Sequence, residues 1–137
     1  MPGLLVNIDV RNLEEALRFY TEGIGLRLVR RLGPDIAELG GAPSPVFLIA
    51  HPPGSAPHPD AGASRSYERH WTPVHLDFAV ADLERAVSRA VSAGAVCEGP
   101  VRGFEAGRYQ VASDPFGNGF CLIELGERGY SALGEPV

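Results

Sequence analysis

The chain has 137 residues, of which 45% are hydrophobic and 21% charged, and its formal net charge is −5. This length suits one compact fold and excludes two large domains, and the composition excludes a disordered or fibrous chain. The scattered charges and their negative sum disfavour nucleic acid and anionic membrane as partners.

The first predicted element is a strand at residues 4–10, whose alternating residues form an apolar face and a mixed face that contains Asp9. Asn12 suits a helix N-cap, with Glu15 as its capping-box partner, and Gly23 and Gly25 suit the helix end. Three strands are expected next, at residues 26–32, 36–39 and 46–50. Residues 1–50 are therefore predicted to form a β-α-β-β-β module, called the first repeat below because residues 74–126 follow the same order.

Residues 51–73 are rich in proline and are predicted to be a linker. Three of the four histidines lie in this segment, at His51, His58 and His70. Histidines grouped in this way can indicate a metal site. Because they are widely spaced in a proline-rich stretch, solvent exposure is the preferred interpretation.

The second repeat, residues 74–126, follows the same order. A strand at its start is followed by the N-cap Asp82 and a helix that ends at Gly94. Three more strands are expected, at residues 95–98, 108–113 and 120–125. A glycine-bounded excursion at residues 101–107 separates the first two, and a dense turn at residues 114–119 precedes the third. Residues 127–137 are predicted as a peripheral tail.

The opening strands of the two repeats have related sequences, LLVNIDV at residues 4–10 and VHLDFAV at residues 74–80. The predicted fold class is therefore α+β, with two tandem βαβββ modules that form a curved mixed sheet around a cup within one structural domain. Helices should cover one face of the sheet. Strand alternation assigns Leu76, Phe78 and Val80 to that face, and leaves His75, Asp77 and Ala79 on the cup face.

No apolar run approaches the roughly 20 residues of a membrane span, and the N-terminal residues lack the features of a signal peptide. We therefore expect a cytoplasmic protein with no membrane partner. Cys97 and Cys121 are too few for a disulfide framework, and Cys121 is expected to be a packed core thiol.

Three features together resemble the vicinal oxygen chelate superfamily, which includes glyoxalase I, extradiol dioxygenases and bleomycin-resistance binding proteins. They are the paired openings VRNLE at residues 10–14 and VADLE at residues 80–84, the turn DPFGNG at residues 114–119, and the strand that ends in Ile123-Glu124-Leu125. The likeness covers about residues 4–125. It is specific for the fold and less so for the activity, because one fold can host many functions.

The resemblance implies a divalent metal, such as zinc, nickel, manganese or iron, held by a first-strand histidine and a last-strand glutamate of each module. Carried over to this sequence, these ligands are His75 and Glu124. The first repeat departs from the pattern, because Leu5 stands at the histidine position and residues 46–50 contain no acid. His75 therefore has two interpretations, a metal ligand or a polar residue that hydrogen-bonds a ligand or Glu124 in a metal-free pocket.

Other residues are candidates for the cup. Asp9 and Asp77 could act as catalytic acid or base, although aspartates also commonly cap loops or pair with arginines. Ligand-binding aromatic candidates are Trp71, Phe47, Phe104 and Tyr109, since small-molecule sites are mostly apolar.

Three functions remain open. One is a glyoxalase-like lyase or isomerase, in which a metal polarises neighbouring oxygens while a carboxylate transfers a proton. Another is a bleomycin-resistance-type protein that sequesters a small molecule without metal. The third, a purely structural dimerisation scaffold, is disfavoured by the polar residues of the cup face. In each case the resemblance implies a homodimer.

Overall fold

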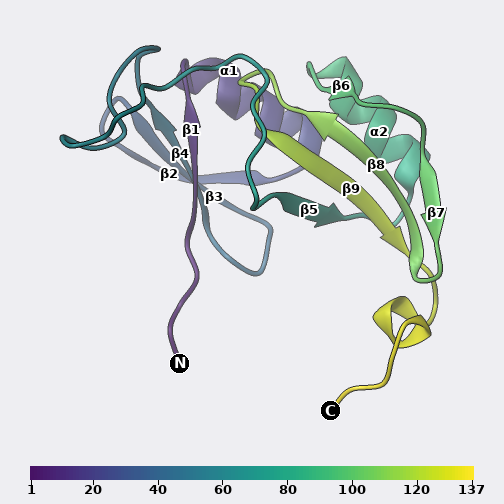
Figure 1. Ribbon diagram of the computed structural model, residues 1–137. Helices are drawn as coiled ribbons and strands as arrows, with labels where there is room; N and C mark the ends of the chain where they lie inside the picture. Colours follow the sequence, from purple (N-terminus) through teal and green to yellow (C-terminus); the bar gives the residue numbers. More distant parts are fainter.

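Each half of the sequence forms its own mixed β-sheet in the computed structural model, which describes residues 1–137 (Figure 1). The first sheet has the order β1-β4-β3-β2, and its strands are β1 (Val6–Val10), β2 (Arg27–Leu32), β3 (Ile36–Gly40) and β4 (Val46–Ala50). The second has the order β5-β9-β8-β6, with β7 also paired to β8; its strands are β5 (Leu76–Ala79), β6 (Val96–Cys97), β7 (Arg102–Phe104), β8 (Gly107–Ser113) and β9 (Gly119–Leu125). The predicted α+β fold is confirmed.

The strands are paired in the same way in both halves. The first strand of each half runs parallel to the last strand of that half, with Val6 opposite Val46 in the first sheet and Leu76 opposite Phe120 in the second. The remaining principal pairings are antiparallel, as hairpin connections allow. As a consequence, β1 and β5 are edge strands of their sheets, and each is free on one side.

The helices begin where the sequence predicts. In α1 (Leu13–Arg18) the Asn12 side chain accepts a hydrogen bond from the Glu15 backbone N–H at 2.9 Å, and in α2 (Leu83–Ser92) Asp82 caps Arg85 in the same way at 3.0 Å. The capping box is only half formed, because the Glu15 carboxylate accepts from the Arg11 guanidinium at 2.8 Å. A turn of π-helix, η1 (Phe19–Ile24), follows α1 directly.

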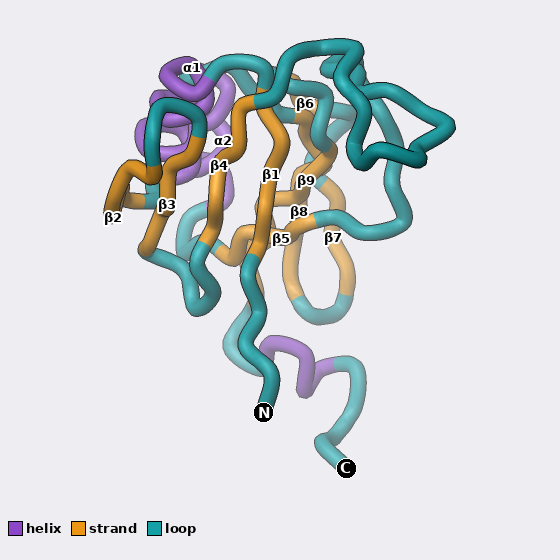
Figure 2. The backbone as a smooth tube through the Cα atoms, turned by 90° about the vertical axis from the view of Figure 1, so that its left-hand side faces the viewer, coloured by secondary structure: helices purple, strands orange, loops and turns teal.

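The two halves share one apolar core. Both helices lie on the same side of the sheets, and both chain termini lie on the opposite side (Figures 1 and 2). Phe19 of η1 packs edge-to-face against Phe120 of β9, with ring centroids 6.1 Å apart. The Arg89 guanidinium of α2 donates to the backbone oxygens of Glu22 and Thr21, so that it caps the end of η1 across the repeat boundary.

Strand alternation in the second repeat follows the prediction. Leu76 and Phe78 pack against the core, whereas Asp77 is exposed on the opposite face. The structure adds β7, which lies within the predicted excursion 101–107, and a short 3₁₀ turn, η2 (Gly129–Ala132), in the tail. None of the helices is long and apolar enough to cross a membrane.

Candidate functional site

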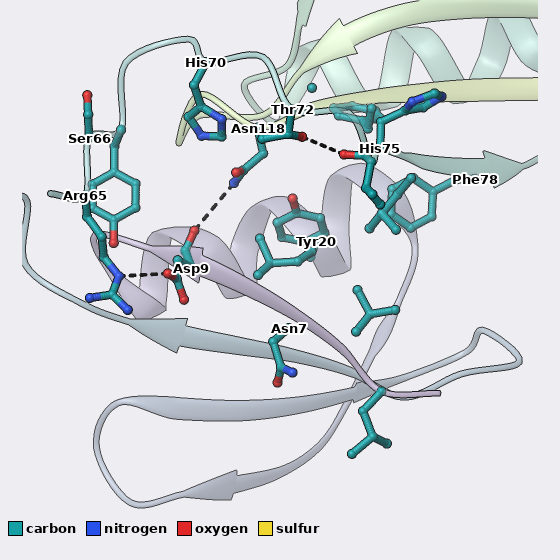
Figure 3. A pocket seen from close by; sticks show the side chains of 18 of the residues that line it. Asn7, Asp9, Tyr20, Arg65, Ser66, His70, Thr72, His75, Phe78 and Asn118 are labelled. Atoms are coloured by element: carbon teal, nitrogen blue, oxygen red, sulfur yellow. Dashed lines mark hydrogen bonds and ion pairs between the residues drawn. The ribbon is translucent and has the colours of Figure 1, made fainter. Parts of the chain in front are cut away.

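The main cavity has a volume of about 620 Å³ and lies between β1 and β5, each of which is an edge strand of its sheet (Figure 3). Ten of its 19 lining residues are hydrophobic or aromatic: Leu4, Leu5, Val6, Ile8, Tyr20, Tyr67, Val74, Leu76, Phe78 and Phe120. The others are mainly polar: Asn7, Asp9, Arg65, Ser66, His70, Thr72, His75, Asn118 and Gly119. The walls come from three separate stretches of the chain, within residues 4–9, 65–78 and 118–120, and from Tyr20.

The position of this cavity corrects one expectation. The sequence placed the functional surface on the face of the sheets that the helices leave open. At β5, however, the cavity wall is formed by Leu76 and Phe78, which lie on the helix side. These side chains are accessible because β5 is an edge strand, and an edge strand can expose side chains of both faces to a neighbouring cavity.

The carboxylate of Asp9 is held in an ion pair. Arg65 donates its Nε–H to Asp9 Oδ2 at 2.8 Å, and the Arg65 side chain is only 12% exposed (Figure 3). The same guanidinium donates to the Ala56 backbone oxygen at 2.8 Å and to the Ser55 hydroxyl at 3.2 Å. Asp9 thus pairs with an arginine. This was one of the two roles that the sequence left open for Asp9, the other being that of a catalytic acid or base.

The segment predicted as a linker covers the cavity. The Tyr67 hydroxyl donates to the His51 backbone oxygen at 2.7 Å, and the His70 backbone N–H donates to the Gly117 oxygen at 3.1 Å. His70 is partly buried and lines the cavity, so the expectation of solvent exposure is wrong for this residue. It is correct for His58, while His51 is partly buried.

The turn before β9 ties the two repeats together. Asp114 is 4% exposed, and its carboxylate accepts from the backbone N–H groups of Phe116 and Asn118 at 2.8 and 2.9 Å. It also accepts from the Asn118 side chain at 2.9 Å and from the Tyr20 hydroxyl at 2.5 Å. Burial, with the nearby Asp114 charge, raises the pKa of Tyr20 well above its usual value, so this phenol remains a donor.

His75 also borders a different cluster. Its Nε2 lies 3.2 Å from Asp77 Oδ1, and Asp77 stands directly opposite Cys121 in the β5–β9 ladder. These three residues line a hollow of about 210 Å³. Burial, reinforced by the Asp77 carboxylate, raises the pKa of Cys121 to about 11. Cys121 is therefore a half-buried thiol on the open face of β9, and the prediction of a packed core position is wrong.

The predicted metal pair, His75 and Glu124, is not brought together. Because Asp77 lies opposite Cys121, His75 falls near Gly119, five residues before Glu124, which corresponds to roughly 16 Å along the strand. Glu124 also faces the helix side. Its Oε2 accepts from the Leu83 backbone N–H at 2.8 Å, and its Oε1 accepts from Arg108 at 2.9 Å.

The metal site implied by the family resemblance therefore does not fit this chain. In the first repeat Leu5 offers no ligand, and in the second Glu124 serves the N-terminus of α2. A second acidic group, Asp82, Glu84 and Glu124, is also occupied. Both oxygens of Glu84 accept from Arg108 at 2.5 and 3.0 Å, and Asp82 caps the helix. These interactions compete with a cation for the same oxygens.

None of the four predicted ligand-binding aromatic residues lines the main cavity. Trp71 is 80% exposed beside a smaller hollow of about 190 Å³ that it shares with His75. Phe104 and Tyr109 form an edge-to-face pair, with centroids 5.8 Å apart, in the hollow beside Asp77. Phe47 lies on β4 opposite Asn7 and borders none of the three hollows.

The sequence reasoning missed several residues of the cavity. Asn7 shares the strand face of Asp9, so alternation along residues 4–10 places it on the cup face, but no pattern marks it as a ligand-binding residue. Asn118 belongs to the recognised turn at residues 114–119, and its side chain reaches the cavity from there. No local pattern identifies Arg65. His70 stood out only as one of three grouped histidines, and its place at the cavity depends on how the proline-rich segment folds back.

Comparison with known proteins assigns the fold to a family. Residues 5–123 match the family described as Glyoxalase-like domain. The anthracycline biosynthesis protein DnrV from Streptomyces peucetius is 32% identical over 127 residues, which cover 93% of this chain and 42% of that protein. This chain thus spans about two-fifths of the length of that relative.

Solved structures agree with this assignment at the level of fold. A glyoxalase-related enzyme from Fulvimarina pelagi superposes with a TM-score of 0.71 at 20% identity, covering 90% of this chain and 87% of that one. TnmS3, an antibiotic binding protein from Streptomyces sp. CB03234, superposes with a TM-score of 0.63 at 24% identity, covering 92% and 97%. Since the family match spans most of its length, this chain belongs to the glyoxalase-like domain family and thereby to the vicinal oxygen chelate superfamily.

Proposed function

We propose that this protein binds a small, largely apolar organic molecule in the cavity between β1 and β5, and that binding there needs no metal. The observation that carries the proposal is the cavity itself. Its volume of about 620 Å³ lies within the range of roughly 300–1,000 Å³ that is typical of small-molecule sites. Its mixture of apolar walls and a few polar groups is also typical of such sites.

The distribution of polar groups suggests how a ligand would be oriented. Leu5, Leu76 and Phe78 offer apolar surface for a ring system. Asn7 and His70 offer hydrogen-bonding groups to oxygen substituents. The ion pair between Asp9 and Arg65 supplies a polar wall with little net charge. A neutral, oxygenated aromatic compound matches this surface better than a highly charged one.

The relatives support the same ligand class. DnrV is named as an anthracycline biosynthesis protein, and TnmS3 as an antibiotic binding protein. We therefore propose polycyclic aromatic antibiotics, or their biosynthetic precursors, as the compounds to test first. The lyase or isomerase alternative requires a carboxylate in the cavity that is free to accept a proton. Asp9 is the one acidic residue that lines the cavity, and its pairing with Arg65 makes binding the better-supported function.

Substituting Asn7→Trp is expected to weaken binding of an anthracycline at least tenfold, because the indole would occupy space in the cavity wall without disturbing the buried core. A tenfold change corresponds to about 1.4 kcal/mol. Binding would be measured by quenching of the anthracycline fluorescence. The wild-type chain should saturate at one ligand per chain, and ligand at 100 times its dissociation constant should add about 2.7 kcal/mol to the free energy of unfolding.

The matched control is Val96→Trp, which places the same indole on β6 at a residue that is 62% exposed and lies outside the cavity. This variant should bind as the wild type does. Equal affinities for Asn7→Trp and wild type would place the ligand elsewhere. The absence of binding across a broad panel of aromatic polyketides would refute the proposed ligand class.

We also propose that the chain forms a homodimer through the apolar rim of the cavity. Leu4, Leu5 and Val74 are 68, 59 and 79% exposed, and all three border the cavity. Neighbouring exposed apolar side chains are commonly covered by a protein partner. Sedimentation equilibrium at micromolar concentration should give twice the 14.6 kDa chain mass for the wild type, and a lower mass for Val74→Glu. A monomeric wild type would contradict this proposal.

A further inference from the structure

A second hollow, of about 190 Å³, lies beside the main cavity and is bordered by Trp71. We propose that this hollow receives a sugar attached to the aromatic ligand. The preferred ligand is then a glycoside, with its ring system in the main cavity and its sugar against Trp71. This inference rests on the function proposed above and extends it to the chemical class of the ligand.

The main cavity and the second hollow are continuous. Five residues border both of them: His70, Thr72, His75, Gly119 and Phe120. In Figure 3 the side chains of His70, Thr72 and His75 follow one another along one side of the main cavity. The second hollow is smaller than the roughly 300–1,000 Å³ of an independent small-molecule site. It therefore suits a substituent of a ligand that is bound in the main cavity.

Trp71 provides the aromatic surface of the second hollow. It is the only tryptophan of the chain, and it is 80% exposed. The face of an aromatic ring carries partial negative charge, so it attracts the slightly positive C–H groups on the face of a sugar ring. Because so much of Trp71 is exposed, its ring is available for this stacking before any ligand binds.

The polar groups next to Trp71 suit the hydroxyl groups of a sugar. His70 makes its hydrogen bonds to Arg69 and Gly117 through its backbone, which leaves the imidazole free. A neutral imidazole offers one donor and one acceptor nitrogen. The Thr72 hydroxyl donates to the Val74 backbone oxygen at 2.6 Å, so its oxygen can still accept a hydrogen bond. Neighbouring donors and acceptors match sugar hydroxyls, which both donate and accept.

The charges around the second hollow favour a neutral or positively charged sugar over an anionic substituent. Arg69 is the one arginine or lysine that borders the hollow, and both carboxylate oxygens of Glu98 accept from it at 2.7 and 2.8 Å. His75 Nε2 lies 3.2 Å from Asp77 Oδ1. A phosphate or carboxylate substituent would therefore meet no unpaired cation and would approach the Asp77 carboxylate.

Comparison of daunorubicin, an anthracycline glycoside, with its aglycone tests the inference. By quenching of anthracycline fluorescence, the wild type should bind the glycoside at least tenfold more tightly. N-acetyldaunorubicin, whose sugar carries no positive charge, should keep this preference, which excludes a general attraction to the negatively charged chain. Trp71→Ala should reduce the preference to less than about threefold, because the stacking surface is lost.

The matched control is Tyr130→Ala. Tyr130 is also an exposed aromatic residue, at 57%, but it borders neither the main cavity nor the second hollow. This variant should keep the full preference for the glycoside over the aglycone. Loss of the preference in Tyr130→Ala as well as in Trp71→Ala would contradict a specific role for Trp71.

A spectroscopic measurement on the wild-type sequence locates the sugar directly. Because Trp71 is the only tryptophan, protein labelled with fluorotryptophan should give one fluorine NMR resonance. Daunorubicin should shift this resonance, and the aglycone should shift it less. Equal affinities for the two compounds, a preference that survives in Trp71→Ala, or the same resonance with both compounds would each overturn the sugar site. Aglycone binding without such a preference would leave the main cavity proposal standing, whereas failure of both compounds to bind would refute the two proposals together.

Discussion

Asp114→Ala is expected to lower the free energy of unfolding by about 3–5 kcal/mol, because several donors would lose their acceptor and each buried donor left unsatisfied costs roughly 1–3 kcal/mol. The carboxylate accepts four hydrogen bonds, from the Tyr20 hydroxyl, the backbone N–H groups of Phe116 and Asn118, and the Asn118 amide. Alanine would leave these donors without an acceptor in a region where water has little access. Urea denaturation of wild type and variant measures the difference.

Two milder substitutions serve as controls for Asp114. Asn at this position keeps an oxygen that can accept the two backbone hydrogen bonds, so Asp114→Asn should lose less than half as much stability as the alanine variant. Tyr20→Phe removes a single hydrogen bond and should cost about 1 kcal/mol. A loss below 1 kcal/mol for Asp114→Ala would show that the turn is not held by this carboxylate.

Gly117→Ala is expected to lower the free energy of unfolding by at least about 2 kcal/mol and to weaken ligand binding at least tenfold. Gly117 has a φ of +81°, a conformation that side chains with a Cβ rarely adopt, and an added Cβ would lie only 2.0 Å from the Glu68 backbone oxygen. The segment around Glu68 would have to move, and with it His70, whose backbone N–H bonds to the Gly117 oxygen. Urea denaturation and anthracycline titration measure the two effects.

A control variant separates the cost of backbone strain at Gly117 from the cost of the contact with Glu68. Gly33 also has a positive φ, of +70°, but an added Cβ there would meet no atom within 4 Å. Gly33→Ala should therefore show only the conformational cost and leave ligand binding unchanged. Equal stability losses in the two variants, with normal binding by Gly117→Ala, would mean that the segment near Glu68 contributes little to the cavity.

Local signals predicted most of the fold. The N-caps Asn12 and Asp82, the turn at residues 114–119 and the alternation along β5 are each determined by near neighbours in the sequence, and all appear in the structure. The π-helical turn η1 and the short strand β7 were not predicted. Both depend on packing and pairing with distant residues, which periodicity alone does not report.

The misplacement of Glu124 has a specific cause. The prediction followed a family pattern and did not apply strand alternation to the last strand. In β9, Phe120 and Leu122 are core residues, so Glu124 shares their face, while Cys121 and Ile123 lie on the other. Counting from the turn would have identified Cys121, rather than Glu124, as the residue beside Asp77.

The cavity itself was less predictable than the fold. One of its walls is the proline-rich segment, which is held by Arg65 on Asp9 and by Tyr67 on the His51 backbone. A composition rich in proline predicts an irregular chain, but it does not predict where that chain will lie. The conclusion that Asp9 is paired rather than free therefore required the three-dimensional structure.

The three stretches that enclose the cavity have a consequence for synthesis of the chain. Residues 4–9 form the first wall, and residues 118–120 complete the last one. No ligand can be enclosed while the ribosome has yet to release Phe120, and contacts between such distant residues form late because their loops are costly to close. The cavity therefore cannot enclose the proposed ligand until both of these distant stretches have left the ribosome.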